Sequence, residues 1–194
     1  NNGSEYFSVE STANAEVGSY SVEVISLAVR QKDVGAESFE DSDTTLLTGE
    51  IQIGDETLSY ENVTLGQLAS MINEEEYGLT ASVINQGVDE GYRLMFTADT
   101  AGDEIDIIGT GDVTIDTVSD GHTINGSLAQ AKIDGIDYYS TSNTLSSTIN
   151  GLTYTLLEPS ESGYDTVTVT NDSEAVLTER LESIIASYNA INTY

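Results

Sequence analysis

Apolar and polar residues alternate in short runs along most of this chain, which is the period-two pattern of half-buried β-strands. One such run places Tyr20, Val22 and Val24 on one strand face, and the phase then shifts by one residue at Ile25. Because a shift of this kind moves side chains to the opposite face, it predicts either a β-bulge in the first long strand or a strand that changes partners. Similar runs recur as far as Val169, so the pattern predicts a mainly β (β-rich α+β) fold.

One segment in the middle of the chain has helical periodicity instead. Its apolar residues recur at helical spacing at Leu65, Leu68, Ala69 and Ile72. Thr64 precedes the segment and Gln67 follows three residues later, which is the capping-box pattern of a helix start. Gly78 then supplies a stop signal. The pattern predicts one short helix among the strands.

The last segment, residues 173–194, is helical in pattern over its whole length. Its apolar residues are spaced four, three, four and three apart, at Leu177, Leu181, Ile184, Tyr188 and Ile191. This spacing is typical of a coiled-coil seam, in which an apolar stripe is buried against neighbouring helices. We therefore predict a stalk-type helix that self-associates through these five residues. No Gly or Pro stop signal follows, so we expect the helix to continue in a longer parent protein.

Strands of similar character lie at both ends of the chain, with a polar loop at 33–45 and a glycine turn at Gly126 between them. We predict two small β-rich head domains, one inserted into the other. The predicted bounds are 1–43 plus 127–172 for the discontinuous domain next to the stalk, 44–126 for the inserted domain, and 173–194 for the stalk helix.

Charge and composition narrow the possible functions. The chain has 34 acidic and 5 basic residues, a formal net charge of -29, and no cysteine. This charge repels nucleic acid and anionic membrane surfaces, so we predict that neither is a partner. No apolar run approaches the length of a membrane span. The first four residues have neither the basic nor the apolar region of a signal peptide, so we expect export without a cleaved signal peptide.

The residues that enzymes need are scarce. His122 is the only histidine, and it lies in a polar turn sequence that favours an ordinary loop over a catalytic triad. The Gly- and Asp-rich stretch 102–120 contains hard oxygen ligands of the kind that bind Ca²⁺, but it has no EF-hand pattern and no strict nonapeptide repeat. We prefer solvated turns there. The sequence therefore predicts no enzyme activity, no catalytic residue, no cofactor and no metal site.

Tyr138 and Tyr139 are adjacent in an alternating run. If both lie on one strand, their side chains point to opposite faces and one of them is exposed. We predict that this pair provides an exposed contact.

Three stretches carry a family resemblance. They are Gly18-Ser19-Tyr20-Ser21-Val22-Glu23-Val24 with Leu27-Ala28 and nearby Gln31; Leu68-Ala69-Ser70-Met71-Ile72-Asn73 with Gly78-Leu79-Thr80-Ala81-Ser82-Val83; and Ile149-Asn150-Gly151-Leu152-Thr153-Tyr154 with Thr166-Val167-Thr168-Val169. The first is similar to the opening head strand of the FliD (flagellar hook-associated protein 2) family. The second resembles the IN motif of flagellin and hook-associated proteins, and the third resembles the C-terminal region of the FliD family.

The resemblance implies a structural protein that caps the distal tip of the bacterial flagellar filament, promotes the folding and polymerisation of flagellin, and is needed for motility. The implied partners are further copies of the chain in a ring, flagellin and the hook-filament junction proteins. The implied location is extracellular, at the filament tip of a secreted appendage. An alternative from the acidic, β-rich character is a cell-surface or host-binding adhesin module of a secreted bacterial protein.

Overall fold

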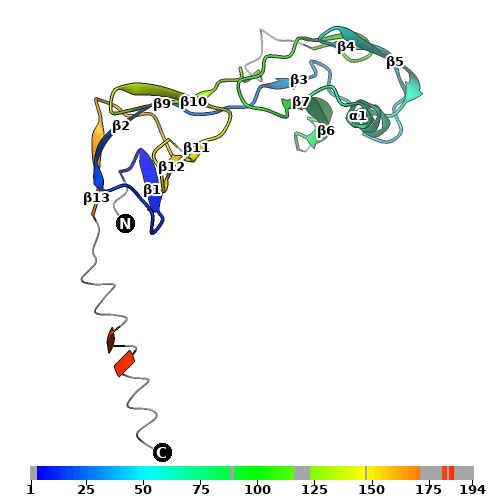
Figure 1. The fold of residues 1–194 in the computed structure, drawn as a ribbon. Helices are drawn as coiled ribbons and strands as arrows, with labels where there is room; N and C mark the ends of the chain where they lie inside the picture. Colours follow the sequence, from blue (N-terminus) through cyan, green and yellow to red (C-terminus); the bar gives the residue numbers. More distant parts are fainter. Residues whose placement is uncertain are drawn as a thin grey trace, which may run out of the picture.

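The computed structural model describes residues 4–87, 90–115, 123–146, 148–170, 181–182 and 184–185. These residues form two β-rich lobes joined by a narrow neck (Figure 1). We call them the first lobe, which contains both the earliest and the latest strands, and the second lobe, which contains the strands between. The prediction of a mainly β fold with one short helix in the second lobe is confirmed.

The first lobe contains two antiparallel sheets. Its strands are β1 (Phe7–Ser11), β2 (Gly18–Ser26), β9 (Ala129–Ile133), β10 (Ile136–Ser140), β11 (Thr144–Ser146), β12 (Leu152–Leu156) and β13 (Asp165–Val169). One sheet has the order β1-β12-β11 and the other the order β10-β9-β2-β13. Strand β2 thus pairs with β9 and β13, which come more than a hundred residues later in the chain. The early and late segments build this lobe together.

The core of the first lobe follows the alternation in the sequence. Val22 and Val24 of β2 are buried beside Ala131 and Ile133 of β9. The register of β2 shifts between Val24 and Ser26, so the predicted bulge is confirmed. The two sheets meet through their inner faces, because side chains of both belong to one buried cluster.

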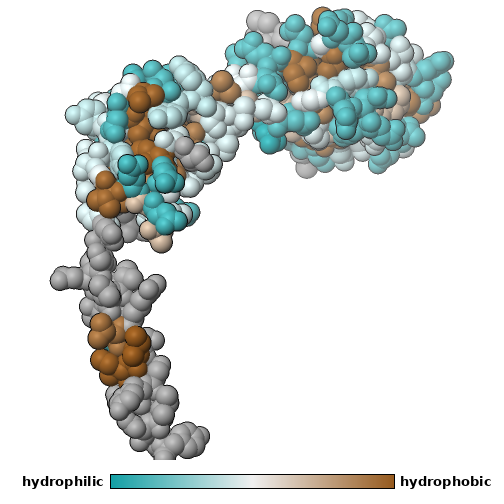
Figure 2. Space-filling model, in the orientation of Figure 1, coloured by the Kyte–Doolittle hydropathy of each residue, from teal (hydrophilic) through white to brown (hydrophobic). Residues whose placement is uncertain are grey.

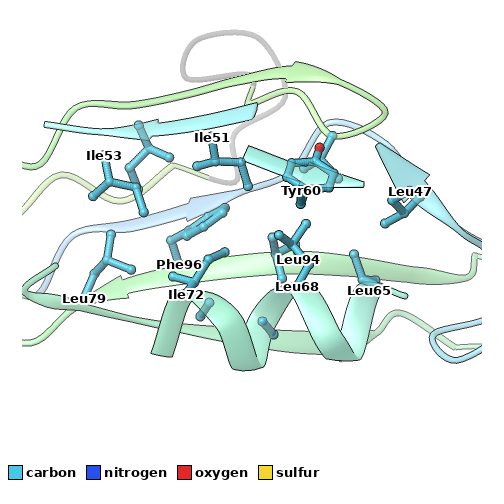
Figure 3. Close-up of a cluster of buried hydrophobic side chains, with 14 residues drawn as sticks. Leu47, Ile51, Ile53, Tyr60, Leu65, Leu68, Ile72, Leu79, Leu94 and Phe96 are labelled. Atoms are coloured by element: carbon cyan, nitrogen blue, oxygen red, sulfur yellow. The ribbon is translucent and has the colours of Figure 1, made fainter. Parts of the chain in front are cut away.

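The second lobe contains two sheets of three strands each, together with the helix. Its elements are β3 (Lys32–Val34), β4 (Leu47–Ile53), β5 (Glu56–Val63), α1 (Leu65–Glu74), β6 (Leu79–Asn85), β7 (Tyr92–Ala98) and β8 (Ile107–Gly111). The sheet orders are β3-β7-β6 and β5-β4-β8. Side chains from both sheets and from the helix meet in a single apolar cluster, with Leu68 and Ile72 of α1 close to Leu94 and Phe96 of β7 (Figure 3).

Helix α1 begins as the sequence predicts. The Thr64 side chain accepts a hydrogen bond from the Gln67 backbone N–H, and the Gln67 side chain accepts one from the Thr64 N–H. These bonds satisfy two backbone donors that have no partner inside the helix. The helix ends at Glu74, and Gly78 follows in a positive-φ conformation before β6.

The chain crosses between the lobes earlier than the predicted boundary after residue 43. Residues 32–34 form β3, which pairs with β7 of the second lobe, and Phe39 forms a bridge with Tyr92. Strand β3 has only three residues, too few to show an alternating pattern, and it acquires its place from its partner strand. Residues 32–43 therefore belong structurally to the second lobe, although the sequence pattern assigned them to the first.

Two antiparallel chain segments form the neck, which we define as residues 27–32 and 123–128. Val29 bridges Ser127 and Lys32 bridges Ile124, so the entering and leaving segments lie side by side. A lobe attached through two adjacent segments is the geometry of one domain inserted into another.

Among the described residues, no helix is long and apolar enough to cross a membrane.

Candidate interaction surfaces

No group of three or more His, Cys, Asp or Glu side chains among the described residues could hold a metal ion. His122 lies outside the described residues. The clearest perturbed groups are phenols: desolvation raises the pKa of Tyr60 and, with smaller contributions from Tyr20, Asp134 and Tyr138, raises the pKa of Tyr154 to about 12. Both rings are buried, and the raised pKa keeps each phenol neutral, which suits a structural role.

Part of the predicted stalk seam is visible. Leu181–Glu182 and Ile184–Ile185 have helical conformation, and Leu181 and Ile184 are 55% and 67% exposed. Ile185, which is not part of the predicted seam, is also exposed. Figure 2 shows these residues as an apolar patch at a distance from the first lobe. Leu177, Tyr188 and Ile191 lie outside the described residues, so self-association through the full seam stays a prediction.

The tyrosine pair lies on β10, at the edge of its sheet. Tyr138 lies opposite Ala131 and packs against the core, whereas Tyr139 is 63% exposed on the other face. The predicted arrangement, with the two rings on opposite faces, is confirmed. The Gln130 Nε2 atom donates to the Tyr139 hydroxyl over 3.1 Å, which holds the exposed ring in place. Its role as a contact stays a prediction.

A groove runs beside this pair. It has a volume of about 310 Å³ and is lined by Tyr138, Tyr139, Ser140, Thr144, Leu145, Ser146 and Thr148. Its two walls are β10 and β11, each of which is the edge strand of its sheet in the part of the chain that the structure describes. Edge strands offer backbone N–H and C=O groups to an incoming chain. The groove can therefore accept an extended segment, and the open edges that form it are a feature of tertiary structure that the alternation of residues did not reveal.

The neck is the third notable surface. The Gln31 side chain accepts a hydrogen bond from the Ile105 N–H over 2.6 Å and donates to the Ile105 carbonyl over 2.7 Å. A Cβ atom at Gly126 would lie 2.6 Å from the Asp103 carbonyl oxygen, so this position requires glycine. Around these contacts Val29, Ile124 and Leu128 are at least one-third exposed. The sequence pointed to Gln31 only through the family resemblance, and its partner Ile105 is distant in the chain.

Comparison with known proteins shows similarity to flagellar hook-associated proteins. The family model described as "Flagellar hook-associated protein 2 C-terminus" matches residues 126–194. The B-type flagellar hook-associated protein 2 of Pseudomonas aeruginosa PAO1 is 23% identical over 94% of the chain, and the match covers 44% of that protein. The chain thus spans about half the length of the curated relatives it matches.

Solved structures agree on the fold. The crystal structure of FliD (HAP2) from Pseudomonas aeruginosa PAO1 has a TM-score of 0.70 at 22% identity, with 97% of this chain and 94% of that chain covered. The D2-D3 domains of the flagellar cap protein FliD from Serratia marcescens have a TM-score of 0.66 at 21% identity, with 85% of this chain and all of that chain covered. The two lobes therefore have the fold of these D2-D3 head domains.

Proposed function

We propose that this chain, which the family model of the flagellar hook-associated protein 2 C-terminus matches over residues 126–194, forms the head of a structural cap at the distal tip of a bacterial flagellar filament. The observation that carries the proposal is the agreement between the two-lobed architecture and the D2-D3 domains of a flagellar cap protein. In this role the head promotes the folding and polymerisation of flagellin, and the cell needs it for motility.

The arrangement of surfaces supports a protein that works by contact. The apolar side chains of Leu181 and Ile184 are exposed to solvent. A helix with such an apolar face is marginally stable alone and is stabilised when neighbouring helices cover that face. We propose that the seam Leu177, Leu181, Ile184, Tyr188 and Ile191 brings copies of the protein together in a ring. The acidic surface of the heads opposes unspecific association and leaves assembly to this seam.

The partners follow from the proposed position. Flagellin subunits reach the tip and meet the heads, and Tyr139 with its neighbouring groove is our candidate for that contact. We propose the hook-filament junction proteins as further partners. We propose a location outside the cell, at the tip of the flagellum. The adhesin alternative receives no support from the relatives and solved structures, whose names describe flagellar hook-associated and flagellar cap proteins.

Gene deletion in the parent bacterium tests the proposed function. We expect cells without the protein to release unpolymerised flagellin, to carry no full-length filaments in electron micrographs, and to lose swimming motility. Expression of the intact gene restores all three. Full-length filaments and normal swimming in the deletion strain would contradict the proposal.

Variants of the restored gene test the two surfaces separately. The double substitution Leu181→Asp and Ile184→Asp places charges in the seam, and we expect it to abolish ring formation in light scattering and filament growth in cells. Glu182→Gln, on the same helical segment, is the matched control and leaves both unchanged. Tyr139→Ser tests flagellin contact: we expect shorter filaments with intact rings.

A further inference from the structure

Strand β10 forms an open edge of the first lobe. The turn that joins it to β9 has two residues, Asp134 and Gly135, and both have positive φ. The residues that flank such a turn bond to each other, and bonded and unbonded pairs then alternate along the hairpin. Asp137 and Tyr139 occupy the unbonded positions of β10. Their backbone N–H and C=O groups therefore point away from β9, where no further strand lies in the part of the chain that the structure describes.

This edge lacks the usual protection against pairing with another chain. Proteins commonly protect an edge strand with lysine, proline or a covering segment. Strand β10 contains neither lysine nor proline. Its one acidic residue, Asp137, is balanced by Lys132 of β9, whose Nζ atom lies 3.7 Å from Asp137 Oδ1. Although the whole chain has a net charge of -29, the edge is therefore close to neutral.

The groove between β10 and β11 is uncharged as well. None of the seven residues that line it is acidic or basic. A second groove, of about 330 Å³, shares Ser146 with the first and is also lined by uncharged residues alone. The neck pocket, of about 520 Å³, differs because Asp33, Glu104 and Asp106 line it. The surface beside β10 can thus be approached by another chain without the repulsion that operates elsewhere on this acidic protein.

The exposed tyrosine on this edge is held in place before any partner arrives. Gln130 Nε2 donates to the Tyr139 hydroxyl over 3.1 Å and to Asp137 Oδ1 over 3.3 Å. Ile136, at the start of the same strand, is 60% exposed. A strand added beside β10 would place alternate side chains on the two faces of the sheet, toward Tyr139 on one face and toward the groove on the other. Because Tyr139 is already ordered, its contact loses little entropy on binding.

We propose that β10 binds an extended segment of a partner polypeptide as an added strand. The segment has an uncharged centre of about five residues, the length of β10, and lysine or arginine at its ends. The neutral groove accepts the uncharged centre, and the negative charge of the surrounding protein attracts the basic ends. The inference deepens the proposed contact with flagellin and rests on it for the identity of the partner.

Strand addition also specifies the state of the partner. A segment can pair with Asp137 and Tyr139 only if its own backbone N–H and C=O groups are free, because each group already bonded inside a folded domain is unavailable. The head therefore binds a subunit whose segment is still extended, before that segment acquires its final fold. This order of events suits a protein that promotes the folding of its partner.

NMR titration of the whole chain with a synthetic peptide tests the proposal. The probe is acetyl-Lys-Thr-Val-Thr-Val-Thr-Lys-amide. We expect saturable shift changes at the amides of β10 and β11, with a dissociation constant on the order of 1 mM because few hydrogen bonds form and little area is buried. We also expect slower hydrogen exchange at the N–H groups of Asp137 and Tyr139, which become bonded in the complex.

Two altered peptides test the chemistry of the segment. N-methylation of alternate residues removes the donors on one edge, and we expect binding to weaken about tenfold, since each lost hydrogen bond contributes a factor of about 2–10. Methylation of either set of alternate residues is compared, because only one set faces β10. Replacement of both lysines by glutamate should weaken binding as well, and salt should reduce the difference between the two peptides.

A backbone variant tests the edge itself. Asp137→Pro removes an N–H group that points away from β9, so the bonds within the hairpin remain. Asp137→Ala removes the same carboxylate but keeps the N–H group and is the matched control. We expect the proline variant to bind the peptide about tenfold more weakly than the alanine variant. The methylated peptides supply the same test with the unaltered chain if the proline variant does not fold.

Three results would overturn strand addition: no saturable binding of the peptide, shift changes away from β10 and β11, or equal binding of the parent and both methylated peptides. Loss of binding in Tyr139→Ser without any effect of N-methylation would likewise replace strand addition by contact with the ring alone. None of these results would contradict the proposed cap function, which the gene deletion tests separately.

Discussion

The two lobes are both small antiparallel β structures, yet the chain assembles them in different ways. The second lobe is built from two hairpins, one helix and two further strands within residues 32–115, so all of its strand pairs close inside one continuous stretch of chain. The first lobe joins β2 to β9 and β13, and β1 to β12, across the whole length of the second. One lobe can form locally, whereas the other must bring distant segments together.

This difference has a thermodynamic consequence. Closing a long loop has an entropic cost that grows only slowly with loop length, but it must be met before the distant contacts stabilise the structure. A folded second lobe holds Val29 beside Ser127 and so shortens the effective loop between β2 and β9. We infer that folding of the inserted lobe assists folding of the lobe that surrounds it.

Cutting the chain at the neck should produce the largest effect. Residues 31–126 expressed alone should fold, because their sheets and core are self-contained. The separated pieces 1–29 and 127–194 should remain unfolded when mixed, since neither contains a complete sheet of the first lobe. A two-residue Asn-Gly turn that joins Val29 to Ser127 should restore the first lobe, as circular dichroism and hydrogen exchange will report. If residues 31–126 were unfolded in isolation, the inference that the second lobe can form locally would be contradicted.

Removing a core side chain from the second lobe is the next largest effect. Leu68 is fully buried on the inner face of α1, so Leu68→Ala leaves a cavity and lowers the free energy of unfolding of that lobe by about 2–5 kcal/mol. Chemical denaturation followed by NMR should show the transition of the first lobe unchanged. Ser70→Ala, on the exposed side of the same helix, is the control. A parallel loss in both lobes would show that they unfold as one unit.

The helix cap contributes less. Thr64→Ala removes the acceptor for the Gln67 N–H and should destabilise the second lobe by about 1 kcal/mol. Thr64→Ser keeps the hydroxyl and should retain most of the stability. Urea denaturation of the three proteins checks this, and equal midpoints for parent and alanine variant would contradict it.

The smallest effect concerns Tyr154 at the centre of the first lobe. Its hydroxyl is buried without a hydrogen-bond partner, so Tyr154→Phe should change stability little at neutral pH. An unfolded tyrosine has a pKa near about 10, whereas burial raises the pKa of Tyr154 to about 12. The unfolded chain therefore loses this proton first, and stability of the first lobe falls as pH rises from 10 to 12. Tyr154→Phe should reduce that fall in thermal unfolding measured across the window, and an identical alkaline decline would exclude this cause.

Local features of the fold could be predicted from the sequence because they depend on neighbouring residues. The capping box at Thr64 and Gln67, the apolar face of α1 and the bulge after Val24 all arise within a few residues. The opposite faces of Tyr138 and Tyr139 follow directly from the period of a strand. In each case the local geometry of the chain allows only one arrangement of the side chains concerned.

Tertiary structure decided what depends on residues distant in the chain. In the sequence, Asp33 is one of many acidic residues and lies in a segment predicted to be a polar loop. In the structure it pairs with Phe96 through β3, and this pairing places it in a buried position beside the neck pocket. Because of the same pairing, residues 32–43 belong to the second lobe, whereas the sequence pattern predicts that they belong to the first. The alternation of residues records which side chains are buried, but not against which strand they pack, because burial is a property of each residue and pairing is a property of two.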